Sequence, residues 1–424
     1  MGILIEIGSF IKLQRTKKGM TLGELADGIV SVSYLSKIEN LKTQASPEII
    51  QLLCNKLGIN VDKSKEPIIK EKCDQWFSML FEVNDKEDII VTYKELQELM
   101  DTNISDYILL FEIHKIRYYL LIGETSQAYN KMEELNEMSD DFDNIHKFYW
   151  FKYRGNYYSV KEDYSNALEM YNQAETLFKF TNLEEHEIAD VYYLLAVTHS
   201  KLRNTLESID FANKALEVYM KQYNFVRCAQ CHNILGISYR RIRMYEKAIK
   251  NYNLALHLGE LNNNKAIIQL TNQNLGHLYS VKGDSEEAIK HYLEVLNDSE
   301  VSPSSRLTTL ASSVSEYYQA GRYEEAKETI HIAFELMKEL KEETHRLSHY
   351  TIHIYHHLLN EEWGKFENVM VNELLPYLKK TKDYANIIIF SSLLADFFEK
   401  QERYKDAAKY YKVVNLAYRQ IANI

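Results

Sequence analysis

A short packing signature recurs along this chain and constrains its fold more than any other feature. A small residue is followed three positions later by an aromatic one and then by another small residue, as in Gly155, Tyr158 and Ala167. Weaker copies extend the series to nine anchors, spaced 38 to 41 residues apart: Phe77, Ile116, Gly155, Ala196, Gly236, Gly276, Val314, Ile354 and Ala395. A unit of this length holds two helices and a turn, so the spacing predicts nine helix pairs. The 4 prolines and 14 glycines in 424 residues also favour helix.

The pattern resembles tetratricopeptide repeats lengthened by about six residues. The proline usual after the second helix and most of the early tryptophans are absent. The resemblance implies an all-α, right-handed solenoid in which small residues let paired helices touch and the aromatic residue fills the notch beside them. Its concave face would cradle a protein or peptide. We expect this array to span residues 73–424 and to carry peptide sensing and oligomerisation.

The first part of the chain differs from the rest in charge and in helix length. Residues 1–65 hold nine Lys/Arg and six Asp/Glu, a balance of +3, so the remainder of the −11 chain carries −14. Short helices are expected over 3–17, from Leu22 to Ile29, after Ser31 or Ser33, and from Pro47. Thr21 with Glu24 forms the capping-box pattern for the second of them. A basic head on an acidic body is typical of a head that meets phosphates.

Residues 5–60 resemble the Xre/phage-repressor helix-turn-helix family, most closely in Thr21…Leu25-Ala26 and in Leu35-Ser36-Lys37-Ile38-Glu39-Asn40. Leu22 stands where the family usually has a glutamine that anchors the DNA backbone. We therefore expect a DNA-binding domain over 1–62 and a linker over 63–72. The implied recognition helix begins near Ser31 and faces the major groove. The expected DNA contacts are Thr21, Ser31, Val32, Ser33, Tyr34 and Lys37, with Arg15, Lys17, Lys18 and Lys42 on phosphates. Alternatively, Lys17 and Lys18 form only a solvated helix end.

The repeat register predicts which side chains line the concave face. Asparagine amides can bind both the N–H and the C=O of an extended backbone, and cations can bind a carboxylate. The expected peptide-binding residues are Arg117, Lys152, Asn156, Tyr193, Asn233, Arg240, Gln273, Asn274 and His277, with Ser159, Ile237 and Ser280 beside them. The alternative is scattered polar surface on exposed helices.

Other candidate chemistry is sparse. Cys228 and Cys231 form a C-x-x-C without a second pair, which favours buried thiols over a zinc or redox site. His345, His349, His353 and His357, with His356, form a stripe; a histidine-lined groove or dimer seam is favoured over a metal site, because no carboxylate sits at a ligand spacing within it. Nucleotide-binding and hydrolase motifs are absent, so we expect neither enzyme activity nor a cofactor or metal. No apolar run reaches membrane-spanning length and no leader pattern is present, so a cytoplasmic protein without membrane contact is expected.

Taken whole, the chain resembles the Rap/Rgg/NprR/PlcR/PrgX quorum-sensing receptors of Gram-positive bacteria, and within them the neutral-protease-regulator branch. The resemblance implies a transcription regulator that binds a short imported peptide and then activates genes for extracellular proteases and degradative enzymes. It also implies a homodimer, a tetramer with peptide, and inhibition of the sporulation phosphorelay through its response regulator by the peptide-free form. Two alternatives stay open: a phage-type peptide receptor controlling lysogeny, and a Rap-like response-regulator or phosphatase modulator with a vestigial head.

Overall fold

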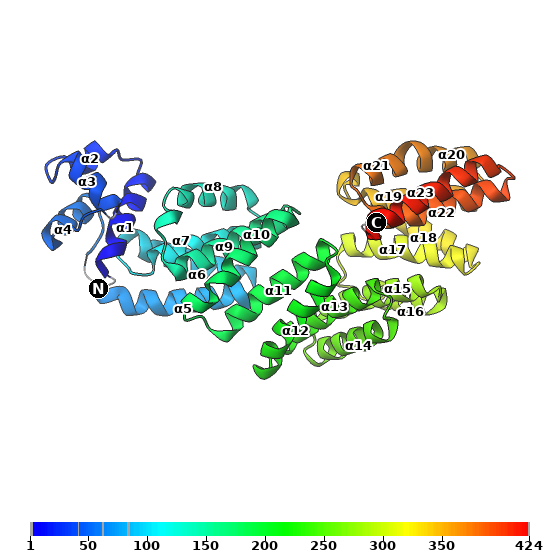
Figure 1. Cartoon of the computed structure of the whole chain (residues 1–424), viewed down its shortest axis with the longest axis horizontal. Helices are drawn as coiled ribbons and strands as arrows, with labels where there is room; N and C mark the ends of the chain where they lie inside the picture. The colour runs from blue at the N-terminus through cyan, green and yellow to red at the C-terminus, as the bar shows by residue number, and fades with distance from the viewer. Residues whose placement is uncertain (1–2, 41, 62, 83–84, 423–424) are drawn as a thin grey trace. The chain divides into compact units, whose positions relative to one another are not determined.

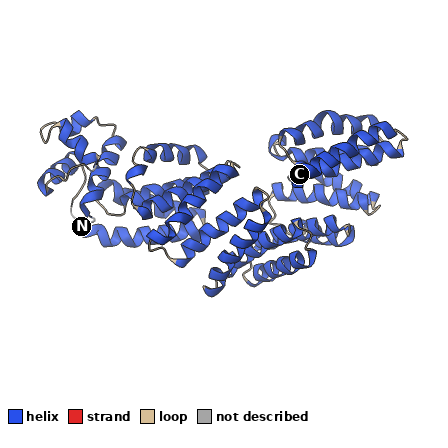
Figure 2. Ribbon diagram, viewed as in Figure 1, coloured by secondary structure: helices blue, strands red, loops and turns tan. Residues whose placement is uncertain are grey.

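The chain is helical throughout the part that its computed structural model describes, residues 3–40, 42–61, 63–82 and 85–422 (Figures 1 and 2). Within those residues no strand forms, and the only ladder contact is an isolated bridge between Asn60 and Asn103. The predicted all-α class is confirmed. The chain divides into two compact units, residues 1–222 and 223–424, which are described separately below. Among the described helices, none has the length and apolarity that crossing a bilayer requires.

The first unit opens with four short helices, α1 (Ile3–Lys17), α2 (Leu22–Ala26), α3 (Val32–Glu39) and α4 (Pro47–Lys56). The predicted capping box of α2 is confirmed, because Thr21 Oγ1 accepts from Glu24 N while Glu24 Oε2 accepts from Thr21 N. Ser31 caps α3, and Pro47 occupies the first turn of α4. Helix α2 ends at Ala26 rather than at Ile29, because Gly28 adopts a left-handed φ of 76°.

The segment expected to be a linker is helical. Residues Lys63–Lys65 form η1, and α5 runs from Glu66 to Glu82, with Pro67 in its first turn, where proline is favoured. The core of α1–α4 continues into that of α5, α6 and α7, where Trp76 is fully buried. Asn60 N donates to Thr102 O, and Ile104 N donates to Asn60 O. The head is therefore packed onto the start of the array by shared core and by backbone hydrogen bonds.

From α5 onward the described helices alternate as first and second members of nine pairs, and every sequence anchor lies on a first helix, beginning with Phe77 on α5. The rest of the first unit comprises α6 (Lys86–Thr102), α7 (Ile108–Ile122), α8 (Thr125–Asn136), α9 (Asn144–Val160), α10 (Tyr164–Thr176), α11 (Glu185–Lys201) and α12 (Thr205–Lys221). Short 3₁₀ turns, η2 (Ser139–Asp141) and η3 (Leu177–Phe180), follow α8 and α10.

The second unit holds the last five pairs. Its helices are α13 (Phe225–Arg241), α14 (Tyr245–Leu261), α15 (Lys265–Lys282), α16 (Ser285–Leu296), α17 (Pro303–Gln319), α18 (Tyr323–Met337), α19 (Glu342–Leu359), α22 (Tyr384–Lys400) and α23 (Tyr404–Ala422). The second helix of the pair that α19 begins is divided into α20 (Trp363–Asn368), the π-turn η4 (Val369–Leu374) and α21 (Leu375–Lys380). The predicted repeat of nine pairs is confirmed over the described residues.

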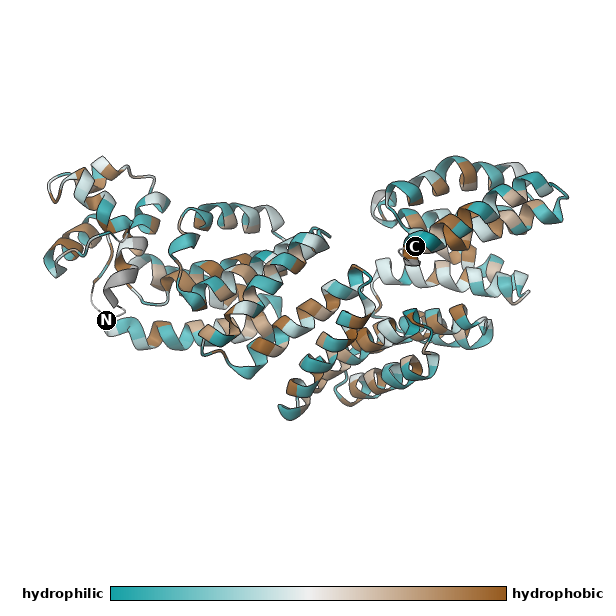
Figure 3. Cartoon of the chain, in the orientation of Figure 1, coloured by the Kyte–Doolittle hydropathy of each residue, from teal (hydrophilic) through white to brown (hydrophobic). Residues whose placement is uncertain are grey.

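Each pair closes on a notch at its anchor. A Cβ added to Gly236 would lie 2.4 Å from a ring carbon of Tyr252, and Gly155 and Gly276 meet Tyr171 and Tyr292 in the same way. The ring that fills the notch thus comes from the second helix, sixteen residues on, and not from the aromatic three positions after the anchor. Figure 3 shows brown apolar positions alternating with teal polar ones along these helices.

A left-handed residue ends the first helix of each described pair after α5, seven positions after the anchor. Glycine takes this place at 123, 283 and 321, but Glu162, Arg203, Arg243, Glu361 and Glu402 take it elsewhere, with φ of 57° to 63°. A non-glycine residue in this conformation costs about 1 kcal/mol. The chain therefore turns sharply at fixed intervals although it contains few glycines.

Candidate functional site

The outward side of α3 is the expected DNA-reading face, and the structure leaves most of it open. Val32 is 50% exposed, Ser33 and Lys37 are exposed, and Leu35 and Ile38 are buried beneath them. Tyr34 is half-buried and donates through its hydroxyl to Gln44 O at 3.3 Å. Ser31 accepts from Tyr34 N, so its hydroxyl oxygen caps the helix. Contact of these side chains with bases stays a prediction.

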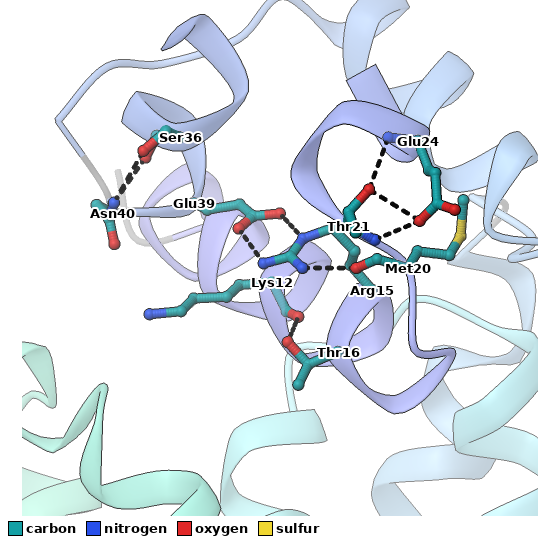
Figure 4. A network of polar contacts seen from close by, with 9 residues as sticks. All are labelled: Lys12, Arg15, Thr16, Met20, Thr21, Glu24, Ser36, Glu39 and Asn40. Atoms are coloured by element: carbon teal, nitrogen blue, oxygen red, sulfur yellow. Dashed lines mark hydrogen bonds and ion pairs between the residues drawn. The ribbon is translucent and has the colours of Figure 1, made fainter. Parts of the chain in front are cut away.

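Arg15 braces the head internally, as Figure 4 shows. Its Nε and Nη2 donate to the two carboxylate oxygens of Glu39 at 2.7 and 2.9 Å, and its Nη1 donates to Met20 O at 2.7 Å. The hydrogen bond to Glu39 raises the pKa of Arg15 against the effect of burial. The guanidinium fork is thus occupied, linking α1 to α3. A phosphate contact by Arg15 stays a prediction and would have to share these donors.

The two lysines at the end of α1 also have partners, so they are not simply a solvated helix end. Lys18 donates to Leu57 O. Lys17 donates to Glu112 Oε1 on α7 at 2.5 Å. Glu112 is fully buried and also accepts from Lys115 at 2.8 Å and Lys131 at 2.7 Å. Burial opposes its charge, but the three ammonium groups outweigh that effect and hold the pKa of Glu112 well below its usual range.

Two of the cations expected to contact DNA remain open to solvent. Lys37 and Lys42 are exposed, and neither side chain has a hydrogen bond or ion pair to any residue in the described ranges. Thr21 is exposed, with its hydroxyl held by Glu24 at 2.8 Å. Within the expected phosphate-contact set, Lys42 is therefore free to meet DNA, whereas Arg15 and Lys17 are engaged within the protein.

In the first unit, the expected trough residues are held by other side chains of the protein. Lys152 is 3% exposed and pairs with Glu187 at 2.5 Å and Asp190 at 2.9 Å, so its charge is neutralised locally. Burial opposes this charge, yet both carboxylates outweigh it and raise the pKa of Lys152. Asn156 Oδ1 accepts from Tyr171 O–H at 2.8 Å. Arg117 and Tyr193 also have interactions within the protein.

In the second unit, the expected trough residues form a chain of neutral hydrogen bonds. Asn274 Nδ2 donates to Asn233 Oδ1 at 3.4 Å, and Asn233 Nδ2 donates to Thr271 Oγ1 at 3.0 Å. Gln273 reaches Thr309 at 3.4 Å. The structure therefore brings the amides of two successive repeats side by side, as binding along an extended backbone would require.

Arg240 lies beside this row without a carboxylate among the described residues. Its Nη1 donates to His277 Nδ1, and its Nε is buried without any hydrogen-bond partner there. The His277 side chain is exposed, but its ring is surrounded by other protein atoms. Desolvation by these atoms and the charge of Arg240 lower the pKa of His277 to about 4. The imidazole is thus neutral at pH 7, and Arg240 keeps a charge and a donor to offer.

His277 and Ser280 border a cavity of about 270 Å³ between successive first helices of this unit. Its wall includes Glu316, a residue that sequence reasoning missed, which is 2% exposed. Glu316 accepts from Ser280 at 2.6 Å and Ser285 at 2.9 Å, and burial raises its pKa. The signal that could have found it is the run of hydroxyl residues in α17, among which one carboxylate stands alone.

The C-x-x-C behaves as the buried thiols expected of it. Both Cys228 and Cys231 are buried and neither forms a disulfide, and burial raises the pKa of Cys228 to about 11. A thiol in that state is a poor nucleophile and metal ligand at pH 7.

Comparison with known proteins matches both halves. The helix-turn-helix family profile covers residues 11–63, and that of the soluble NSF attachment protein, SNAP, covers residues 150–320. The transcriptional activator NprA of Geobacillus stearothermophilus is 34% identical over 94% of this chain and 100% of its own length. Response regulator aspartate phosphatase I of Bacillus subtilis is 21% identical over 86% of this chain and 94% of its own. A solved structure of NprR in complex with its cognate peptide NprX superposes with a TM-score of 0.59 and 22% identity, over 82% of this chain and 96% of that one.

A helix-turn-helix head fused to a tetratricopeptide-like array places the chain in the class of repeat-containing transcription regulators. Within that class, its identity to NprA over essentially both full lengths shows that the chain belongs to the NprA family of transcriptional activators.

Proposed function

We propose that this protein is a cytoplasmic quorum-sensing transcription activator, not an enzyme, whose activity is set by a short extended peptide bound in the trough of the second unit. The observation that carries the proposal is the row of Asn233 and Asn274 amides together with Arg240, which has a buried donor and no carboxylate partner among the described residues. Support comes from the activator name of the NprA relative and from the peptide in the NprR structure. The genes expected to respond are those of extracellular proteases and degradative enzymes.

Peptide recognition follows from the donors that are present. Asn233 is buried and Asn274 is partly exposed. When these amides release their present hydrogen bonds to each other and to Thr271, each can accept from a backbone N–H and donate to a backbone C=O, which gives affinity for any extended chain. Arg240 supplies a charge-assisted hydrogen bond to an acidic side chain or a terminal carboxylate. Two carboxylates already hold Lys152, so a peptide carboxylate would have to compete with them for its ammonium group.

Control of transcription follows by population shift. A peptide that bridges several repeats stabilises the array geometry in which it makes more contacts. In a homodimer, or a tetramer with peptide, that geometry sets the distance between two heads, which must match two half-sites on DNA. The packing of α1–α4 onto α5 and α7 gives the head a firm attachment through which such a change can act.

The test uses the full chain. Short synthetic peptides of random sequence are incubated with it, retained peptides are identified by mass spectrometry, and the best one is titrated by calorimetry. Asn233→Ala and Asn274→Ala should each weaken binding at least about tenfold, since each leaves peptide groups unpaired. Asn262→Ala is the matched control, since Asn262 is exposed and bonds only its own helix. Unchanged affinity in both trough variants would refute the trough assignment.

A second candidate function is modulation of a response regulator by a protein with a vestigial head, as the name of the Bacillus subtilis phosphatase relative suggests. The observation that favours it is the internal engagement of Arg15 and Lys17. A gel shift on the DNA upstream of the chain's own gene separates the two. Specific retardation, lost in Lys37→Ala, supports the activator, and no retardation supports the modulator. A phage-type receptor controlling lysogeny predicts the same retardation and is separated by its genomic neighbours.

A further inference from the structure

The histidine stripe ends in a cluster that the proposed function does not use. His356 and His357, in the last turn of α19, and Glu362, at the start of α20, present one ligand atom each, and these atoms lie within 4.8 Å of one another. All three residues are partly exposed, so the cluster is open to solutes. His357 Nδ1 and Glu362 Oε2 are 2.6 Å apart.

The turn between the helices brings the carboxylate back to the histidines. Glu361 takes the left-handed conformation with φ of 57°, and Glu362 N then donates to His357 O at 2.9 Å. Helical spacing alone places ligands three or four residues apart, whereas Glu362 lies five residues after His357. The stripe therefore lacks a carboxylate in sequence and gains one in the fold.

The groups around the cluster orient its ligands. Lys365 donates to Glu362 Oε1 at 2.8 Å, which leaves Oε2 directed at His357. The His356 ring lies 5.2 Å from that of Phe334 and within 3.2 Å of Asn360 Nδ2. Such outer contacts fix ligand geometry in metal sites.

We propose that His356, His357 and Glu362 form a binding site for a first-row divalent transition metal, with zinc as the representative ion. Two imidazoles and one carboxylate are a donor set that suits zinc, nickel or copper rather than magnesium or calcium. The donors have to close to about 3.3 Å from one another, the separation that tetrahedral bonds of about 2.0 to 2.1 Å impose. Side-chain rotation of partly exposed residues can supply that movement.

Metal binding at His357 replaces the hydrogen bond that its Nδ1 now makes with Glu362. The ring proton moves to Nε2, so the imidazole stays neutral and the carboxylate stays charged. Three protein ligands leave a fourth position for water or for a ligand. His356 also borders a cavity of about 200 Å³, lined further by His331, Phe334 and Asn360. The ion would cross-link the end of α19 to the start of α20.

The test is a zinc titration of the full-length protein without an affinity tag, after removal of metal with a chelator. The wild type should bind one equivalent by calorimetry. Glu362→Gln and His357→Gln should each weaken binding at least about tenfold. His345→Gln is the matched control, because it removes a histidine from the same helix three turns from the cluster, and it should change affinity less than about twofold. Thermal unfolding of the metal-free variants checks that each is folded.

Three outcomes would overturn the proposal. The wild type could bind no stoichiometric zinc. His345→Gln could weaken binding as much as His357→Gln, which would show diffuse chelation by the stripe. Cobalt in place of zinc could give a thiolate charge-transfer band, which would put the ion at Cys228 and Cys231; the proposed ligands predict only weak visible bands. None of these measurements involves peptide or DNA, so the result is independent of the proposed function.

Discussion

The two units of this protein bury charge in different ways. In the first, charges are buried in balanced groups: Glu112 lies among Lys17, Lys115 and Lys131, and Lys152 lies between two carboxylates. In the second, charged groups that are partly or fully buried meet neutral partners. Arg240 meets His277, and Glu316 meets only serine hydroxyls among the described residues.

The difference separates groups that hold the fold from groups that can hold a ligand. A buried charge without an opposite charge is costly, and the protein recovers that cost when a partner arrives. In the first unit the partner is built in, so a ligand would have to compete with it. In the second unit no opposite charge compensates the desolvation of these groups, so binding of a ligand of opposite charge is favoured. Each prediction below tests this contrast.

Lys152→Met should have the largest effect, on stability. It leaves Glu187 and Asp190 close together without their cation, and removal of one partner of a buried ion pair costs about 3 to 5 kcal/mol. Urea unfolding at pH 7 measures the loss. Lys152→Met combined with Asp190→Asn should recover part of it. A loss below about 1 kcal/mol would mean that these charges are not balanced internally.

Glu112 and Glu316 should give opposite dependences of stability on pH. The pKa of Glu112 is lowered in the fold, so its contribution is present above the unfolded value of about 4.3 and is lost as pH falls. The pKa of Glu316 is raised, so its contribution is present below about 4.3 and is lost as pH rises through the folded value.

Glutamine variants measured by urea unfolding at pH 4 and pH 7.5 check both signs. Glu112→Gln should destabilise by about 3 kcal/mol at pH 7.5 and by less at pH 4. Glu316→Gln should gain stability relative to the wild type on going from pH 4 to pH 7.5. If the effect of both variants on the free energy of unfolding changed with pH in the same direction, the two units would not differ in how they bury charge.

Arg240→Met should lower the affinity for the selected peptide by about 10- to 100-fold, since it removes a charge-assisted hydrogen bond. Stability should change by less than about 1 kcal/mol, because no carboxylate in the described residues depends on Arg240. Arg240→Lys should not restore affinity, because an ammonium cannot reproduce the fork. If folded Lys152→Gln protein lost as much peptide affinity as Arg240→Met, the first unit would also contribute to the peptide-binding site.

The repeat and the capping pattern could be predicted from sequence because both are local. The anchor must be small because a ring fills the notch at Gly236, and Thr21 with Glu24 closes a box within four residues. The helix that runs through the segment expected to be a linker has Pro67 in its first turn, a position that proline favours.

The partners of the charged residues could not be predicted in the same way. Lys17 meets Glu112 across 95 positions, and Lys152 meets Glu187 across 35. Repeat periodicity places a side chain on a face but does not say which side chain of the next pair opposes it. The partner of Glu362 could not be predicted either, although it is close in sequence. The left-handed residue Glu361 turns the chain so that Glu362 lies beside His357.

The smallest predicted effect concerns DNA binding by the head. There too, a cation held within the protein can be compared with one that is open to a ligand. Each phosphate contact contributes about 0.9 to the slope of log affinity against log salt. Lys42→Gln should lower the slope on upstream DNA by about 0.9, because Lys42 is exposed and has no partner in the described residues. Lys17→Gln should leave the slope unchanged, since Glu112 holds that ammonium. Fluorescence anisotropy at several salt concentrations measures both. An equal drop for Lys17→Gln would show that DNA takes Lys17 from Glu112, so that DNA binding would loosen the head from the array.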